Sequence, residues 1–183
     1  MARRFRWLMG SLLLAMLAIG AVAEAQQVPS SLSRAGRFVF GAGLGLQADT
    51  LDDTVFSFGL SGDYYLTSNF SIGPLVQFGL GGDLFQFGLS GQAKYTFDIP
   101  ELPAIKPHIE GGIGFVYADL DRPGGRGGDD TSFLVPLGVG FEYRINSSLS
   151  LDTTLLFNFT DLNIRERDDN FFLTWLVGLR IPF

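Results

Sequence analysis

The stretch Leu84–Phe97 reads LFQFGLSGQAKYTF and alternates between two kinds of residue. Its large apolar members are Phe85, Phe87, Leu89, Ala93, Tyr95 and Phe97. The residues between them are small or polar, namely Gln86, Gly88, Ser90, Gln92, Lys94 and Thr96. A period of two is typical of a β-strand, in which successive side chains point to opposite faces. The stretch therefore predicts a strand with one apolar face and one small, polar face.

The same alternation recurs in seven further segments, which are separated by turn-forming residues. They are Gly36–Ala48, Thr54–Leu66, Phe70–Gly81, Ile105–Ala118, Ser132–Ile145, Leu149–Thr160 and Asn170–Phe183. Short connections join consecutive strands as antiparallel neighbours. The chain is therefore expected to be all-β, with eight antiparallel strands in up-and-down order.

Eight antiparallel strands in up-and-down order can close into a barrel. The composition of the two faces indicates whether water or lipid surrounds it. A soluble barrel also alternates, but its apolar face points inward, and an eight-stranded barrel leaves only a narrow interior. Large aliphatic and aromatic residues in every segment would overfill that interior, whereas Gly, Ser and Gln fit it. Aromatic residues also gather toward both ends of the apolar bands, as interfacial girdles require. The sequence thus predicts a transmembrane β-barrel with its apolar face toward lipid.

The N-terminus is typical of an export signal. Arg3, Arg4 and Arg6 precede an almost wholly apolar run from Leu8 to Ala23, and Ala23-Glu24-Ala25 supplies a small-x-small cleavage site. An uncleaved membrane anchor is disfavoured because the run is shorter than the roughly 20 residues of a spanning helix. We expect a cleaved signal peptide at 1–25, a short periplasmic segment at 26–35 and the barrel domain at 36–183. Loss of three of 13 basic and one of 19 acidic residues changes the net charge from -6 to -8.

Composition excludes several classes of function. The chain has no cysteine and one histidine, which argues against disulfides, thiol catalysis and metal catalysis. A net charge of -6 argues against nucleic acid as a partner, because phosphate binding needs a basic face. No cofactor or metal site is expected.

The lengths of the connections predict the orientation of the barrel. The longest and most charged connections are residues 119–131 and 161–169, and both lie on the same side. Long loops of outer-membrane barrels are extracellular and short turns periplasmic. We therefore expect both termini in the periplasm and two solvated polar loops outside. The first loop contains Asp119, Asp121, Asp129, Asp130, Arg122 and Arg126, and the second contains Arg165, Glu166, Arg167, Asp168 and Asp169.

The final segment alternates through to a terminal aromatic residue. Its alternate positions are Phe171, Leu173, Trp175, Val177, Leu179, Ile181 and Phe183. With the signal peptide and the eight segments, it resembles the small OmpA/OmpX-type family of bacterial outer-membrane β-barrels over essentially the whole mature chain. The resemblance implies localisation in the bacterial outer membrane, contact with its lipid and lipopolysaccharide, and a monomer. It also implies insertion by the barrel-assembly machinery, with these residues as an assembly signal, although Phe183 also serves to anchor the last strand.

Charged residues on the inward face lie mostly toward the periplasmic side. They include Arg37 and Asp63, and the predicted ion-pair network consists of Lys94, Lys106, Glu110, Glu142, Arg144, Asp152 and Arg180. Charges in a narrow, low-dielectric lumen must be paired or reached by water. We expect a network centred on Glu110, Glu142, Arg144 and Arg180 that plugs the periplasmic half. His108 lies two residues before Glu110. The resemblance implies that lipid A deacylases of this architecture need a serine two residues after the histidine. This chain has Glu110 at that position, so the deacylase activity is not carried over.

The extracellular half of the interior is expected to have few polar residues and no charge. Its expected lining is Gly45, Val55, Gly79, Leu84, Gly88, Val116, Ala118, Leu134, Pro136, Leu156, Phe172 and Leu176. Simple packing of these residues is favoured over a small apolar pocket. The favoured function is a structural or surface-interaction role without enzymatic activity. A narrow channel or carrier for small apolar solutes is second, and a lipid A-modifying enzyme is third.

Overall fold

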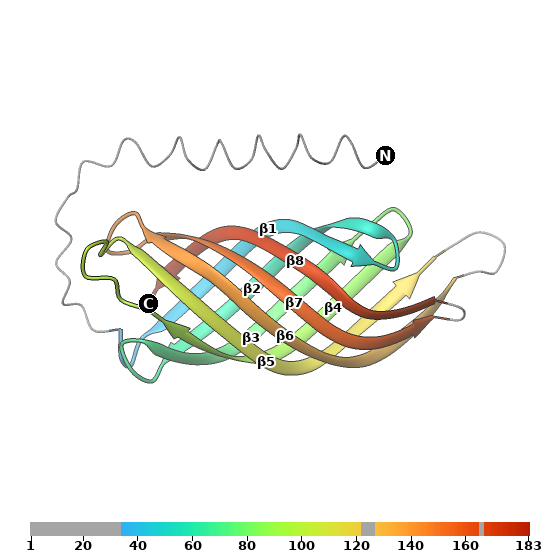
Figure 1. The fold of residues 1–183 in the computed structure, drawn as a ribbon, viewed down its shortest axis with the longest axis horizontal. Helices are drawn as coiled ribbons and strands as arrows, with labels where there is room; N and C mark the ends of the chain where they lie inside the picture. Colours follow the sequence, from blue (N-terminus) through green and yellow to red (C-terminus); the bar gives the residue numbers. More distant parts are fainter. Residues whose placement is uncertain (1–33, 122–126, 165–166) are drawn as a thin grey trace.

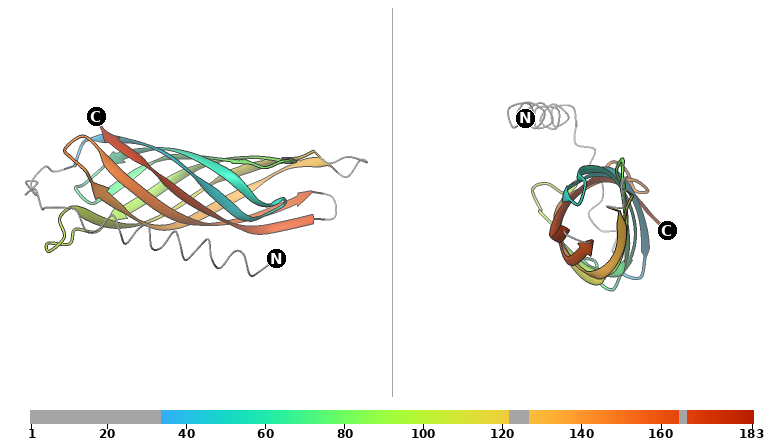
Figure 2. Two further views of the ribbon diagram at one scale, coloured as in Figure 1. Left: turned by 90° about the horizontal axis from the view of Figure 1, so that it is seen from above. Right: turned by 90° about the vertical axis from the view of Figure 1, so that its right-hand side faces the viewer.

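The computed structural model describes residues 34–121, 127–164 and 167–183, which form a closed barrel (Figures 1 and 2). The eight strands are β1 Phe38–Thr50, β2 Asp53–Tyr65, β3 Phe70–Leu80, β4 Leu84–Thr96, β5 Ile105–Leu120, β6 Gly128–Arg144, β7 Ser150–Ile164 and β8 Arg167–Pro182. The expected signal peptide and most of the expected segment 26–35 lie outside the described residues.

Each strand pairs antiparallel with its neighbours in sequence, and β1 closes the barrel against β8. The closing register runs from Val39↔Pro182 to Ala48↔Leu173. This is the up-and-down order that the spacing of the segments predicts. No helix in the described part of the chain is long and apolar enough to cross a membrane.

The two faces of the wall are arranged as the alternation predicts. On the outside, Ile113 is 73% exposed and Phe133 51%, whereas inward-facing Val116 and Leu134 are fully buried. Large exposed apolar side chains occur on every strand and surround the barrel, as a lipid-facing surface requires. The transmembrane interpretation of the alternation is confirmed.

Strands β5 to β8 extend farther than the sequence predicts. They have 16, 17, 15 and 16 residues, against 11 to 13 in β1 to β4. Figure 1 shows them reaching beyond the other strands at the end opposite the start of β1 and the end of β8. We call the end where β1 begins and β8 ends the terminal end and the other the distal end.

The described residues of the two expected loops are therefore mostly strand, and the prediction of loops at these positions was wrong. Asp119 pairs with Asp129 across β5 and β6, Asp130 also lies in β6, and Asp169 lies in β8. Strand pairing continues because Leu120, Leu162 and Ile164 still bury inward-facing side chains at this height. Asp121 follows β5 directly, Arg167 and Asp168 belong to β8, and Arg122, Arg126, Arg165 and Glu166 lie outside the described residues.

Glycine allows the wall to curve tightly around the narrow lumen. A Cβ added at Gly73 would lie 1.6 Å from the backbone oxygen of Gly62, and one added at Gly45 would lie 1.7 Å from that of Trp175. Neither position therefore has room for a side chain, which is typical of glycine at sharp bends in a sheet.

Candidate functional site in the lumen

The deepest ion pair of the lumen joins β8 to β2. Arg180 Nη2 donates a 2.7 Å hydrogen bond to Asp63 Oδ2, and both residues are about 3% exposed. Gly41 of β1 lies between these strands and pairs with Arg180 in the register. Arg180 passes over Gly41 to reach Asp63, and a Cβ at Gly41 would meet Ser61 Oγ of β2 at 2.4 Å while making only ordinary contact, at 3.6 Å, with Arg180 Cγ.

Lys94 extends the network to β4 and β5. Its Nζ lies 2.7 Å from Glu110 Oε2 and 3.7 Å from Asp63 Oδ2. Lys94 and Glu110 are directly opposed in the register, so the shorter contact follows from strand pairing. Asp63 therefore lies between two cations, and it also accepts a 3.4 Å hydrogen bond from Ser71 Oγ.

Arg34 closes the terminal end of the lumen from outside the strands. Its guanidinium donates to both carboxylate oxygens of Glu142, at 3.0 Å and 2.5 Å, and to the hydroxyl of fully buried Tyr65 at 3.0 Å. Sequence analysis missed Arg34 because periodicity assigns inward faces only within strands. The available signal was a basic residue just before the first strand, where the chain enters the barrel mouth.

His108 forms a buried group with two residues of β7. Thr154 Oγ1 donates to Asp152 Oδ2 at 2.9 Å, and His108 Nε2 lies 3.1 Å from Thr154 Oγ1. The hydrogen-bond network therefore places a proton on Nε2, which donates to the threonine. In a nucleophile pair the histidine accepts the hydroxyl proton instead. The hydrogen bonds of His108 therefore fit a structural role and not that of a general base paired with a nucleophile.

Two members of the predicted network do not join it. Lys106 reaches Asp98 in the connection between β4 and β5, although Glu142 is its partner in the register. Arg144 forms no ion pair within 4.0 Å with the described residues and lies half-buried at the terminal end. Of the expected centre, Glu110, Glu142 and Arg180 take part in the lumen ion pairs, whereas the placement of Arg144 there was wrong. The closest partners also differ, because Arg180 is anchored by Asp63 and Glu142 by Arg34. Hydrogen bonds from Lys106 and then Asn69 lower the pKa of Asp98.

The middle of the lumen contains an apolar layer followed by an amide layer. Leu75, Leu156 and Leu176 form a buried cluster directly above the charges. Next, Gln77 Nε2 donates to Asn158 Oδ1 at 3.2 Å, and Asn158 Nδ2 donates to Thr174 Oγ1 at 3.0 Å. The lining residues expected from the sequence for the extracellular half of the interior did not include these amides, nor buried Gln47 and Gln86. The expectation of few polar residues there was wrong.

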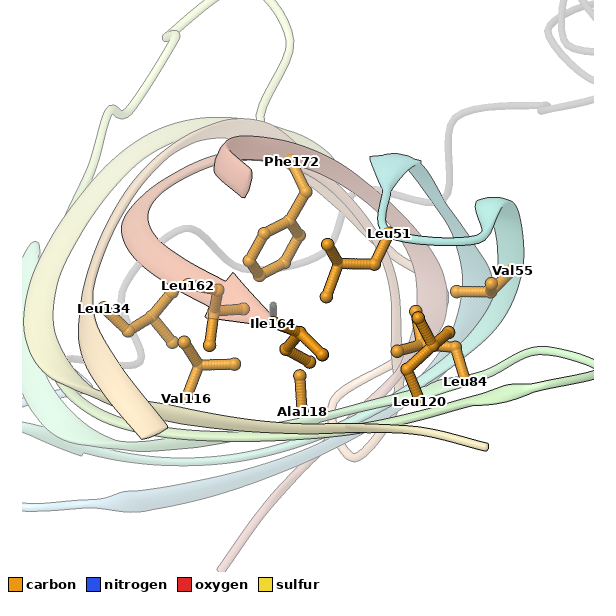
Figure 3. Packing of buried hydrophobic residues seen from close by; sticks show 10 residues of the cluster. All are labelled: Leu51, Val55, Leu84, Val116, Ala118, Leu120, Leu134, Leu162, Ile164 and Phe172. Carbon is orange, nitrogen blue, oxygen red and sulfur yellow. The ribbon is translucent and has the colours of Figure 1, made fainter. Parts of the chain in front are cut away.

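An apolar cluster fills the distal part of the lumen. Its side chains converge from the surrounding strands in Figure 3. The members are Leu51, Val55, Leu84, Val116, Ala118, Leu120, Leu134, Leu162, Ile164 and Phe172. Nine of the ten are at most 3% exposed, so packing and not a pocket accounts for the predicted lining residues among them. We call this cluster the distal plug.

The ion-pair network encloses a small cavity. The space that water centres can reach is about 50 Å³, and its lining includes Asp63, Lys94, Glu110, Asp152 and Arg180. That volume suits a few water molecules. Among the described residues, no group of three or more His, Asp or Glu side chains could hold a metal ion.

Comparison with known proteins places this geometry in a family. Residues 11–183 match the family described as the outer membrane protein beta-barrel domain. The chain belongs to this family. It is an integral protein of the bacterial outer membrane, as its closed barrel and exposed apolar band require.

Solved structures share the fold at low sequence identity. Neisserial surface protein A has a TM-score of 0.67 and 18% identity, over 82% of this chain and 99% of that one. The N-terminal β-barrel domain of Pseudomonas aeruginosa OprF has a TM-score of 0.60 and 14% identity, over 80% and 97%. The attachment invasion locus protein Ail of Yersinia pestis has a TM-score of 0.58 and 17% identity, over 81% and 99%. No curated protein sequence shows significant similarity to this chain.

Proposed function

We propose that this protein is a closed, non-enzymatic barrel with a structural or surface-interaction role. The observation that carries the proposal is the filling of its lumen by three successive barriers. They are the Arg34–Glu142 pair at the terminal end, the buried ions with Leu75, Leu156 and Leu176, and the distal plug. A hydrated path would have to open all three.

Conductance of the refolded protein in a planar bilayer tests the closed state. We expect no discrete openings from the wild-type chain. Glu142→Ala should also be silent, because the distal plug lies far from Glu142 and remains packed. Arg144→Ala serves as the control, since Arg144 makes no ion pair with the described residues.

A narrow channel or carrier for small solutes is the alternative, and the small cavity between the ions favours it. In that case wild-type protein would show salt-dependent openings, and Glu142→Ala would increase their conductance. Either result would contradict the closed-barrel proposal.

Lipid A modification is the third candidate. The lone histidine, His108, is 3% exposed and faces the lumen, where a lipid substrate has no access. We therefore expect purified protein to leave lipid A unmodified. Turnover that His108→Ala abolishes would overturn the assignment as a non-enzyme.

The distal end is the surface that we propose for interaction. Asp49, Asp53, Asp119 and Asp129 are charged residues of its hairpins. Clustered carboxylates favour cationic partners over anionic ones. Two structural neighbours are named a surface protein and an attachment invasion locus protein, which agrees with a role at the cell surface.

Shortening the β5–β6 hairpin tests this surface. Replacing residues 121–130 with a two-residue turn should abolish binding of the refolded barrel to cationic peptides, whereas the barrel stays folded. Binding is measured by fluorescence anisotropy with a labelled polylysine and with a neutral peptide as control. Unchanged affinity for polylysine after shortening would contradict the role of this hairpin.

The remaining partner assignments are also proposals. We propose that the barrel is a monomer in contact with outer-membrane lipid and lipopolysaccharide, and that the barrel-assembly machinery inserts it. The last strand supports the latter, because Leu179, Ile181 and Phe183 are exposed on its outer face, with Phe183 at 79%. This row of side chains is open to a partner during insertion.

A further inference from the structure

A second cavity opens at the terminal end, below the ion-pair network. Its water-accessible space is also about 50 Å³. Four guanidinium groups and a single carboxylate line it, from Arg34, Arg37, Arg144, Arg180 and Glu142. Asn146, Ser147 and Ser150 add polar side chains. The lining therefore has a clear excess of positive charge in a chain that is acidic overall.

The carboxylates within reach do not neutralise this excess. Glu142 accepts hydrogen bonds from the two terminal nitrogens, Nη1 and Nη2, of Arg34. Arg180 donates to Asp63, which does not line this cavity. Arg37 and Arg144 form no ion pair with the described residues. Residues 26–33, which precede Arg34, include no Asp or Glu in the sequence.

A buried donor provides an independent indication that an acceptor belongs here. The Nε atom of Arg180 has no hydrogen-bond partner, although the side chain is only 3% exposed and lines this cavity. Glu142 Oε2 lies 3.8 Å from this Nε, beyond hydrogen-bond distance. A buried charged donor without an acceptor is costly, so an anion that reached it would be stabilised.

We propose that this cavity is a binding site for a phosphate group, with Arg37 and Arg144 as its principal ligands. Guanidinium groups match phosphate through paired, charge-assisted hydrogen bonds. Arg180, Asn146 and Ser147 also line the cavity and carry further hydrogen-bond donors. Two sources supply this chemistry at the periplasmic end of an outer-membrane barrel: free phosphate, and the headgroup of a phospholipid in the inner leaflet.

Isothermal titration calorimetry with inorganic phosphate tests the site directly. The full mature barrel is refolded in an uncharged maltoside detergent at low ionic strength, because salt screens exposed charges. We expect saturable binding that the double variant Arg37→Gln, Arg144→Gln weakens about tenfold or more. Lys106→Gln is the matched control, since it removes one positive charge at the same end but from the pair with Asp98. Its affinity should equal that of the wild type.

Nanodiscs distinguish the two sources. Barrels in phosphatidylcholine with and without phosphatidylglycerol are examined by native mass spectrometry for retained lipid. Retention of either phospholipid by the wild type and the Lys106→Gln control, but not by the double variant, identifies the headgroup phosphate as ligand. Binding of inorganic phosphate without any lipid retention that depends on Arg37 and Arg144 identifies free phosphate instead.

The proposal is overturned if phosphate and phosphatidylglycerol bind the wild type and the double variant equally, or bind neither. Each variant is first checked for the folded barrel by its resistance to unfolding in cold detergent gels. Arg37→Lys, Arg144→Lys gives a second readout, because lysine keeps the charge and loses the paired geometry. We expect this variant to recover only part of the affinity, and recovery of the full wild-type affinity would contradict recognition by paired guanidinium hydrogen bonds.

Discussion

Replacing Asp63 with asparagine is expected to lower the free energy of unfolding by about 3 to 5 kcal/mol. Asp63 accepts the 2.7 Å hydrogen bond of Arg180 and lies 3.7 Å from Lys94. Both cations are at most 5% exposed, so the variant leaves Arg180 without its closest counter-charge inside the barrel. Uncompensated buried charge is the most expensive electrostatic defect in a protein. Equilibrium unfolding in urea with lipid vesicles measures the change.

Asp98→Asn is the matched control for this substitution. It makes the same chemical change in the ion pair with Lys106, but the Asp98 side chain is 54% exposed at the terminal end. Water replaces the lost partner there, and we expect a loss within about 1 kcal/mol. Equal effects of the two variants would contradict the view that the lumen network is shielded from water.

The sequence is sufficient to predict the wall of the barrel but not the partners inside it. Alternation is a local property, so it locates strands and assigns faces without knowledge of the rest of the chain. Ion pairing across the lumen depends on side-chain length and on strands that are far apart in the sequence, as in the pair between Arg180 of β8 and Asp63 of β2. The register brings Lys106 beside Glu142, yet Lys106 turns outward to Asp98.

The ends of the strands were also beyond prediction from polarity. Aspartate is depleted in strands, and the run around Asp129 and Asp130 is typical of a loop. In the structure these residues continue β6, because the pairing with β5 adds backbone hydrogen bonds and Leu120 is buried inside. Tertiary pairing therefore overrides local propensity at the distal end. Arg34 lies outside every periodic segment, so only the fold reveals its place in the mouth.

Gly73→Ala is expected to cost about 3 kcal/mol or more, or to prevent closure of the barrel. The new methyl group would lie 1.6 Å from the backbone oxygen of Gly62 and 3.2 Å from Asp63 Cα. Those atoms belong to the backbone of β2, so no side-chain rotation relieves the clash. The strand that carries Asp63 would have to shift, and because Asp63 accepts the hydrogen bond of Arg180, this substitution is coupled to the ion-pair network. Heat-modifiable migration in gels and urea unfolding report closure and stability, respectively.

Gly91→Ala provides the comparison within the neighbouring strand. Gly91 faces outward on β4, and an added Cβ there has no heavy atom within 4 Å. Alanine is slightly favoured over glycine in a strand, since glycine loses more conformational freedom on folding. We therefore expect Gly91→Ala to be neutral or mildly stabilising. If both alanine variants close and unfold like the wild type, the close approach of β2 and β3 at Gly73 does not restrict which residue the barrel accepts there. The expected effect of Gly73→Ala on the Asp63–Arg180 pair would then be contradicted as well.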